Sequence, residues 1–436
     1  MKKILFLAVL AVVPSLFAAR LTIIPKGKFD FKAGEKVTFV VTAYDDDDKL
    51  LTEGRFRLAF HKSGGEQLRK IERVNLAKKG NPFEVTASMD EPGFILVRAT
   101  ELVKPDNTKV KWDVKSPANF LGGAAVEPEK IRAVNPVPED FDKFWQDTLK
   151  SFKNAKVLIS PAPDIKRDNY KVSRIQIPFP DGSGAIYGFL SIPEGGGKFP
   201  AIVGVPGAGR GSISPVPYWV PGKKAISLWF NVLPYPAAKK ERIQSKLYEE
   251  YTNSLNARYS YTRYFYYKAE DKNSYFYRNI WAAVSRGIDY VATLPEFDGK
   301  NFAAAGNSQG GGTALVLGGL NNNISCVVAS VPAFCDHGGW KVGRKSGWPD
   351  LHGALKGAAD ASAPYFDAST FAARIKVPTL ISVGYIDTTC SPVSVLAAFN
   401  NLKGHKELFP MPQNGHRNHP DFWNKVQQFL DDNLSK

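Results

Sequence analysis

A serine flanked by glycines is the first residue in this sequence whose setting indicates chemistry. Gly306-Asn307-Ser308-Gln309-Gly310 follows the run 300–305, which we predict to be a buried strand, and precedes a predicted helix of small and apolar residues, 311–320. A strand, a G-x-S-x-G turn and a helix form a nucleophile elbow, in which the serine backbone is strained and the glycines avoid collisions with neighbouring elements. We therefore interpret Ser308 as a nucleophile, rather than as a serine in an ordinary glycine-rich turn.

A nucleophilic serine needs backbone N–H groups that stabilise the oxyanion formed on a carbonyl substrate. The N–H of Gln309 should lie at a helix N-terminus and point to that position. A second donor should come from the loop after the predicted strand 199–205, which is Pro206-Gly207-Ala208-Gly209-Arg210-Gly211. Pro206 has no N–H, so the candidate donors are Gly207 and Ala208.

Two partners of the serine should follow it in the order acid, then histidine. Asp387 comes directly after the predicted strand 378–384, and His416 follows the next short strand, 407–410. In this arrangement His416 would take the proton of Ser308, and Asp387 would fix the imidazole tautomer and support the imidazolium. We therefore predict a Ser308-His416-Asp387 triad that cleaves an ester.

Other interpretations of these residues stay open at this point. Asp387 has the position of a common turn or cap aspartate, and His419 and His337 are alternatives to His416 among the six histidines. His416, His419 and Asp421 have the composition of a metal site but lack a third well-spaced ligand, so we expect no metal and no other cofactor.

The elements expected around these residues indicate the fold of the C-terminal part, 138–436. A helix at 138–149 is followed by a hairpin, 171–178 and 185–193, and then by strands alternating with helices, ending in the helix 422–434. This order predicts a mixed sheet covered by helices on both faces. Together with the elbow, it predicts the α/β-hydrolase fold.

The preceding part of the chain has a different pattern. Residues 20–115 contain short strand-like runs separated by turn residues, which predicts a small all-β, immunoglobulin-like sandwich. Residues 116–137, with Gly122-Gly123 and several prolines, are typical of a linker. Residues 1–19 resemble a secretory signal peptide, with Lys2-Lys3 before a ten-residue apolar stretch too short to span a bilayer, so we expect an exported, periplasmic or extracellular protein.

Composition narrows the classes of partner. Lys and Arg outnumber Asp and Glu by 57 to 42, but the basic residues are dispersed and no nucleic-acid motif is present, so we expect no nucleic-acid partner. No segment after the signal is long and apolar enough for a membrane span, so we expect no membrane partner. Three cysteines leave at least one thiol unpaired within a monomer; which of them pair stays open.

Five segments of the C-terminal part, in order, resemble the acetyl xylan esterase / cephalosporin-C deacetylase family (carbohydrate esterase family 7). They are Pro138–Trp145, Ser308–Gly312, Val331–Cys335, Val383–Pro392 and Asn414–His416. The resemblance implies Ser308, Asp387 and His416 as the triad and Gln309 and Ala208 as oxyanion donors. It also implies a hydrolase of acetyl esters on sugars, with acetylated oligo- or polysaccharide as substrate, and a homo-oligomer, since the family often forms hexamers.

Three features of the chain differ from the family pattern. Residues 231–236 stand where the family has Arg-Gly-Gln-Gly, Arg417 follows His416 where the family has glutamate, and the N-terminal β part is additional. The aromatic-rich segment 248–277 has two interpretations, a sugar-binding mouth or helix packing against the core.

These observations together predict an exported serine esterase that removes acetyl groups from acetylated carbohydrate of the xylan type. Within enzymes, the alternative is an esterase or peptidase of the same fold that acts on another acyl group. From another class, the alternative is a glycan-binding protein with an inactive hydrolase fold.

Overall fold

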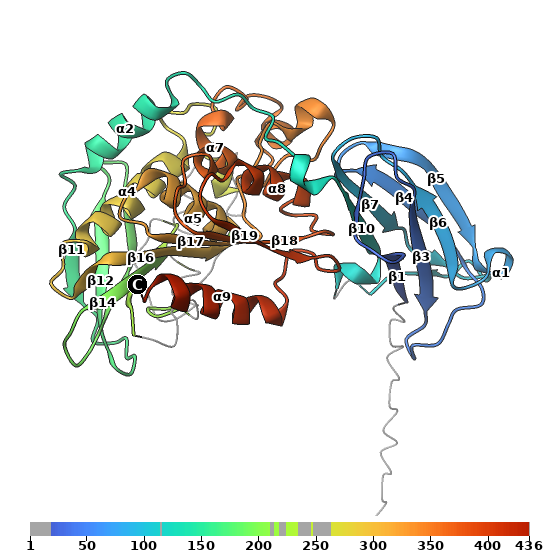
Figure 1. Ribbon diagram of the computed structural model, residues 1–436, viewed down its shortest axis with the longest axis horizontal. Coiled ribbons are helices and arrows are strands. Elements are labelled where there is room, and N and C mark those ends of the chain that lie inside the picture. Colours follow the sequence, from blue (N-terminus) through green and yellow to red (C-terminus); the bar gives the residue numbers. More distant parts are fainter. Residues whose placement is uncertain are drawn as a thin grey trace, which may run out of the picture.

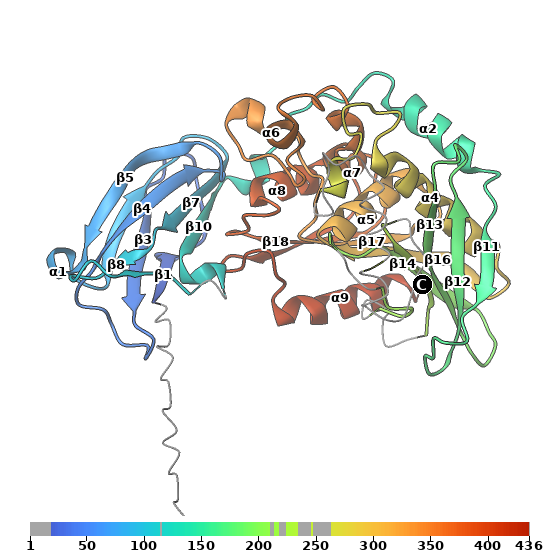
Figure 2. The ribbon, with the colours of Figure 1, turned by 180° about the vertical axis from the view of Figure 1, so that it is seen from behind.

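The computed structural model describes residues 19–113, 116–209, 213–217, 224–233, 246 and 263–435. Two parts lie side by side, an N-terminal all-β part and a larger C-terminal part built on one sheet (Figures 1 and 2). The predicted signal peptide, except for Ala19, lies outside the described residues. Within the described residues, no helix is both long and apolar enough to cross a membrane.

The N-terminal part consists of two sheets that enclose one hydrophobic core. The first sheet contains β1 (Arg20–Pro25), β3 (Val37–Tyr44) and β6 (Phe83–Ala87). The second has the order β2 (Asp30–Phe31), β10 (Leu121–Val126), β7 (Gly93–Ala99), β4 (Arg55–Lys62), β8 (Leu102–Val103) and β9 (Lys109–Val110), and β5 (Gln67–Asn75) pairs with β4. The short helix α1 (Leu76–Lys79) follows β5. Buried residues alternate along β3, as expected for strands with one face on a core, so the predicted all-β part is present.

The region predicted to be a linker, 116–137, differs from that prediction. Leu121–Val126 form β10, which pairs with β7 in antiparallel register from Leu121↔Arg98 to Val126↔Gly93. The two glycines that indicated flexibility instead allow close approach of other backbone. A Cβ on Gly122 would lie 2.3 Å from the Ile23 carbonyl oxygen, and one on Gly123 would lie 2.8 Å from that of Tyr385. The β part therefore extends to Val126, beyond the predicted boundary at 115.

The C-terminal part is built on a nine-stranded mixed sheet. Its strands, in spatial order, are β11 (Leu158–Pro161), β12 (Tyr170–Pro178), β13 (Ala185–Pro193), β15 (Ile226–Asn231), β14 (Phe199–Gly204), β16 (Phe297–Asn307), β17 (Cys326–Ser330), β18 (Thr379–Gly384) and β19 (Lys406–Met411). The pairs from β11 to β15 are antiparallel, and those from β15 through β14 to β19 are parallel.

Helices cover both faces of this sheet (Figure 1). They are α2 (Phe141–Phe152), α4 (Phe276–Val291), α5 (Gln309–Leu320), α6 (Leu351–Leu355), α7 (Ala368–Ala372), α8 (Pro392–Asn401) and α9 (Pro420–Asn433). Along β16, Ala303 and Ala305 pack in one hydrophobic cluster with α9, whereas Phe302 and Ala304 pack in another with α4 and α5. This arrangement confirms the predicted α/β-hydrolase fold.

The carboxyl ends of the parallel strands meet at one edge of the sheet. Ser308 follows β16, Asp387 lies three residues after β18, and His416 lies five residues after β19. In α/β sheets this edge is where ligands bind, so the fold brings the three predicted residues to the usual place of an active site.

Candidate active site

Ser308 occupies the strained turn between β16 and α5. Its backbone has φ 56° and ψ −119°, a conformation that non-glycine residues rarely adopt. A Cβ on Gly306 would lie 2.4 Å from the Gly310 carbonyl carbon, and a Cβ on Gly310 would lie 2.3 Å from the Val205 carbonyl oxygen. Both glycines are therefore required by close packing, which confirms the predicted elbow. The serine itself is 7% exposed, so it is less open to solvent than its position above the sheet would indicate.

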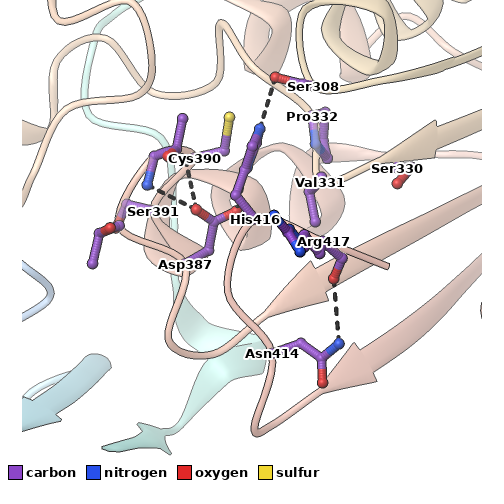
Figure 3. A network of polar contacts seen from close by, with 12 residues as sticks. Ser308, Ser330, Val331, Pro332, Asp387, Cys390, Ser391, Asn414, His416 and Arg417 are labelled. Atoms are coloured by element: carbon purple, nitrogen blue, oxygen red, sulfur yellow. Dashed lines mark hydrogen bonds and ion pairs between the residues drawn. The ribbon is translucent and has the colours of Figure 1, made fainter. Parts of the chain in front are cut away.

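His416 bridges the serine and the aspartate (Figure 3). Its Nε2 lies 2.8 Å from Ser308 Oγ, and its Nδ1 lies 2.7 Å from Asp387 Oδ2. The three side chains come from three different loops at the carboxyl edge of the sheet. The structure thus brings together the residues proposed from the sequence, in contact order Ser308, His416, Asp387.

Asp387 orients the imidazole from a fully buried position. The side chain is 0% exposed, and its Oδ1 accepts hydrogen bonds from the N–H groups of Thr389 (2.7 Å) and Cys390 (3.0 Å). Oδ2 is then left to accept from His416 Nδ1–H, which leaves the lone pair of Nε2 facing Ser308. Asp387 therefore has both roles considered from the sequence: one carboxylate oxygen caps the turn, and the other orients His416.

The predicted oxyanion donors lie beside the serine. Gln309 is the first residue of α5, so its N–H has no acceptor within the helix. A Cβ on Gly207 would lie 3.9 Å from Ser308 Cβ, which places the 206–209 loop against the elbow. Among the described residues, the N–H groups of Gln309, Gly207 and Ala208 have no acceptor and remain available to a substrate oxygen.

A buried network around the Gln309 side chain was not predicted from the sequence. The hydroxyls of Tyr264 and Tyr277 each donate to its Oε1 at 2.6 Å, and its Nε2 donates to the Pro206 carbonyl at 3.1 Å. The Gly209 N–H also donates to the Tyr264 hydroxyl, at 3.4 Å. These bonds tie the 206–209 loop to the elbow, so both sources of oxyanion donors are held by one side chain.

Asn418 is a second residue that the sequence did not single out. Its Oδ1 accepts from the hydroxyls of Ser330 (2.6 Å) and Ser382 (3.1 Å), and its Nδ2 donates to Asn307 Oδ1 (3.2 Å). These partners lie on β17, β18 and β16. The loop that carries His416 is therefore anchored to three neighbouring strands two residues beyond the histidine.

The aromatic segment 248–277 is described only from residue 263 onward, and residues 248–262 lie outside the described part. Tyr264, Tyr275 and Tyr277 are at most 1% exposed, and Tyr277 packs edge-to-face on Phe334 with ring centroids 4.7 Å apart. These three tyrosines therefore pack in the core and do not line a sugar-binding mouth.

The remaining candidate residues have structural roles in the described region. His419 is the N-cap of α9, where its Nδ1 accepts from the Asp421 N–H at 3.3 Å, and the described residues contain no group of three or more His, Cys, Asp or Glu side chains that could hold a metal. His337 is buried beside Phe334 and is not part of the triad. Of the stretch 231–236, only Asn231, Val232 and Leu233 are described, all buried.

All three cysteines are free and buried. Burial, followed by the charge of Asp387, raises the pKa of the Cys390 thiol well above its usual range. Burial also raises the pKa of Cys326 to about 12. Cys390 lies beside the triad (Figure 3), but its thiol is protonated at neutral pH, so it does not compete with Ser308 as a nucleophile.

The α/β-hydrolase fold, with a serine at the elbow and a histidine between that serine and a buried aspartate, defines the class of hydrolases that act through a nucleophilic serine. Comparison with known proteins narrows this class. The sequence matches the acetyl xylan esterase (AXE1) family over residues 126–433. The chain belongs to this family.

Individual relatives agree with that assignment. Acetyl esterase Axe7A of Xylanibacter ruminicola is 27% identical over 348 residues, 78% of this chain and 74% of the relative. The fold is similar to that of acetyl xylan esterase 1 from Thermoanaerobacterium sp. JW/SL YS485 (TM-score 0.58, 20% identity, 71% of this chain and 98% of the other). It is also similar to acetyl xylan esterase from Paenibacillus sp. R4 (TM-score 0.57, 22% identity, 71% and 99%).

Proposed function

We propose that this protein removes acetyl groups from acetylated carbohydrate of the xylan type through an acyl-enzyme on Ser308. The observation that carries the mechanism is the position of His416, which lies within hydrogen-bonding distance of both Ser308 Oγ and Asp387 Oδ2. His416 takes the serine proton as Oγ attacks the ester carbonyl, and then donates it to the departing sugar hydroxyl. In the second half-reaction His416 activates a water that releases acetate and frees the serine.

The oxyanion formed in each half-reaction is stabilised by backbone N–H groups. Gln309 and Ala208 are the proposed donors, and the Gln309 side chain holds the two backbone segments together through Pro206 and Tyr264. Loss of one such donor typically costs roughly 3–4 kcal/mol of transition-state stabilisation. Fixing both donors before the substrate binds is therefore a large part of the proposed catalysis.

The proposed substrate rests on the family and on the names of the relatives. The matched family and both matched structures are described as acetyl xylan esterases, and the relative from Xylanibacter ruminicola as an acetyl esterase. We further propose that the protein is exported, because Met1-Lys2-Lys3 and the following apolar stretch have the pattern of a signal peptide. Export would place the enzyme where polysaccharide is found.

The test of this function is acetate release from acetylated xylo-oligosaccharides, compared for the wild-type protein and Ser308→Ala. The wild type should release acetate, and the variant should lose more than about 99% of kcat while keeping its fold, because it lacks the nucleophile. A variant that retains most of the wild-type rate would contradict the mechanism.

Acyl size separates acetyl esterase activity from the alternative of another acyl group. A pocket that fits a methyl group excludes longer chains by overlap, whereas unfilled space discriminates by only about 1–3 kcal/mol per methylene. For acetate and butyrate esters of one alcohol, kcat/KM should fall steeply from acetate to butyrate. Equal rates on the two esters would favour a general esterase.

A further inference from the structure

The outer face of the N-terminal sheet lies directly behind the loop that carries Asp387. The Phe94 ring of β7 packs edge-to-face on the Tyr385 ring, with centroids 5.0 Å apart and an interplanar angle of 76°. The Tyr385 hydroxyl donates to Asp30 Oδ1 of β2 at 2.9 Å. Ile386 forms a small hydrophobic cluster with Leu96 and Leu121 of the N-terminal sheet. The two residues before Asp387 are therefore buried against the N-terminal part.

The loop that carries His416 is backed by the same part of the chain. A Cβ on Gly415 would lie 2.6 Å from Pro117 Cγ, so the residue before the histidine has no room for a side chain. Pro117 begins the short 3-10 turn that leads into β10. The Ile386 N–H donates to the Asn414 carbonyl at 3.3 Å, which joins the acid loop to the histidine loop. Both loops thus rest on one surface.

Lys345 makes a third contact between the N-terminal part and the active-site loops. The β4–β5 turn of the N-terminal part reaches the 338–347 segment, where the Ser63 carbonyl accepts from the Lys345 N–H (3.2 Å) and the Gly343 carbonyl accepts from the Glu66 N–H (3.2 Å). Ser63 is 2% exposed and has φ 51°, and its hydroxyl accepts from the Phe94 N–H at 3.1 Å. The turn is therefore fixed in an unusual conformation that presents its carbonyl to Lys345.

The side chain of Lys345 then reaches the acid loop. Its ammonium donates to the carbonyl of Thr388, the residue after Asp387. It lies at a cavity of about 190 Å³ between the two parts, whose lining includes Phe94, Arg98 and Asp387. Burial lowers the pKa of Lys345, although the charge of Asp387 opposes this shift. Lys345 is half-buried, and this hydrogen bond holds its ammonium against the acid loop.

We propose that the N-terminal β part positions the acid and histidine loops of the active site, and that Lys345 is the positioning residue that links its β4–β5 turn to Asp387. The family match begins at residue 126, so the strands β1 to β9 of the N-terminal part lie outside the matched residues, whereas Lys345 lies within them. The inference rests on the proposed function. The sequence left the role of the N-terminal β part open.

The chemistry explains why such support would matter. Catalysis by a triad requires its members to be held within a fraction of an ångström, and a misplacement of about 1 Å can cost roughly a hundredfold in rate. The Asp387 loop follows a strand near one end of the sheet, with only β19 beyond it. The N-terminal sheet is the element that covers this loop from behind.

The test compares Lys345→Met, Lys345→Arg and a matched control, Lys62→Met, on a small aryl acetate. Lys62 lies in the same β4–β5 region, but its ammonium pairs with Glu91 within the N-terminal part. Lys345→Met should lower kcat about tenfold or more with KM changed less than about twofold, and Lys345→Arg should restore most of kcat. Lys62→Met should keep the wild-type kcat.

A second variant keeps the test decisive if Lys345→Met does not fold. Tyr385→Phe removes the bond to Asp30 and keeps the ring that packs on Phe94, and its kcat on the aryl acetate should fall several-fold. Wild-type kcat in the folded variants, or a loss confined to polymeric substrate, would overturn the proposal and favour a glycan-binding module. If Lys345→Met keeps full activity while Ser308→Ala is inactive, only this inference fails; if Ser308→Ala is active, the proposed function fails.

Discussion

His416 is the residue on which the proposed chemistry depends, because its two ring nitrogens contact the nucleophile and the acid. Asp387 can serve this histidine since its other oxygen is already saturated by two backbone N–H groups. Gln309 supports the serine in a different way, because its side chain joins the elbow to the 206–209 loop.

The Gln309 network leads to a prediction about Tyr264. Tyr264→Phe removes the hydroxyl that contacts both Gln309 Oε1 and the Gly209 N–H, and so loosens the oxyanion loop. We expect kcat to fall about tenfold with KM nearly unchanged, because the lost order matters most when the oxyanion forms. Steady-state kinetics on an aryl acetate measure this.

Tyr275→Phe is the matched control for that variant. Tyr275 is equally buried, but its hydroxyl donates to the Phe265 carbonyl, away from Gln309. Its kcat should stay near the wild-type value. Equal losses in the two variants would mean that tyrosine hydroxyls stabilise this region in general and do not position the donors.

The triad could be predicted from the sequence because each member follows a strand and the order of the three matches the fold. The residues that hold the triad could not. Gln309 is hydrogen-bonded to tyrosines 32 and 45 positions earlier, and Asn418 is hydrogen-bonded to a serine 88 positions earlier. These contacts therefore depend on how the sheet and helices pack. The sequence around such polar residues contains no local pattern that distinguishes them from polar residues on the surface.

At the scale of elements, the loop after β17 contains an unusual carboxyl group. Asp336 is 0% exposed, and burial followed by the charge of Asp367 raises its pKa to about 7. Its Oδ1 accepts from the Val134 N–H at 2.8 Å, and Arg344 opposes the shift weakly. In the unfolded chain its pKa returns to an ordinary value near 3.9.

This shift predicts how stability depends on pH. Between about pH 4 and 7 the folded protein keeps a proton on Asp336 that the unfolded chain releases, so the free energy of unfolding falls as pH rises through this window, by up to about 4 kcal/mol. Asp336→Asn removes this contribution. Chemical denaturation from pH 4 to 8 should give a smaller decline for the variant than for the wild type.

The control for that experiment is Asp168→Asn, at an exposed carboxylate in the same part of the chain. It should leave the wild-type pH dependence in place. An unchanged decline in Asp336→Asn would show that this carboxyl group is ionised in the folded protein.

The elements themselves were largely predictable where their patterns were strong. The helices expected at 138–149 and 422–434 correspond to α2 and α9, and the strand expected at 378–384 corresponds to β18. β10 was missed because Leu121-Gly122-Gly123-Ala124-Ala125-Val126 has few β-branched residues and two glycines. Those glycines are explained only by the close approach of Ile23 and Tyr385, which lie 99 and 262 positions away.

At the scale of the whole molecule, the two parts share an interface that the sequence did not predict. Phe94 and Ala125 of the N-terminal sheet belong to the same hydrophobic cluster as the core of the C-terminal part. The sequence indicated two separate units joined by a linker, since each has its own periodicity. Contacts between the outer face of the N-terminal sheet and the loops of the C-terminal part produce no periodic pattern in the sequence.

This interface predicts the behaviour of a truncated chain. A protein starting at residue 127 loses Phe94, Leu96 and Leu121, and thereby exposes Tyr385 and Ile386, which are 3% and 1% exposed in the full chain. Exposing two such side chains costs roughly 3–6 kcal/mol. The truncated protein should unfold at a clearly lower temperature, and calorimetry on both proteins measures the difference. Equal unfolding temperatures would show that the interface adds no stability.

The most direct test of the whole account is covalent labelling of the nucleophile. A sulfonyl fluoride reacts with an activated serine, and peptide mass spectrometry locates the label. The account predicts one label on Ser308, loss of esterase activity in proportion to labelling, and no label on heat-denatured protein. Full activity in a protein whose Ser308 is completely labelled, or inactivation with the label on another residue, would contradict it.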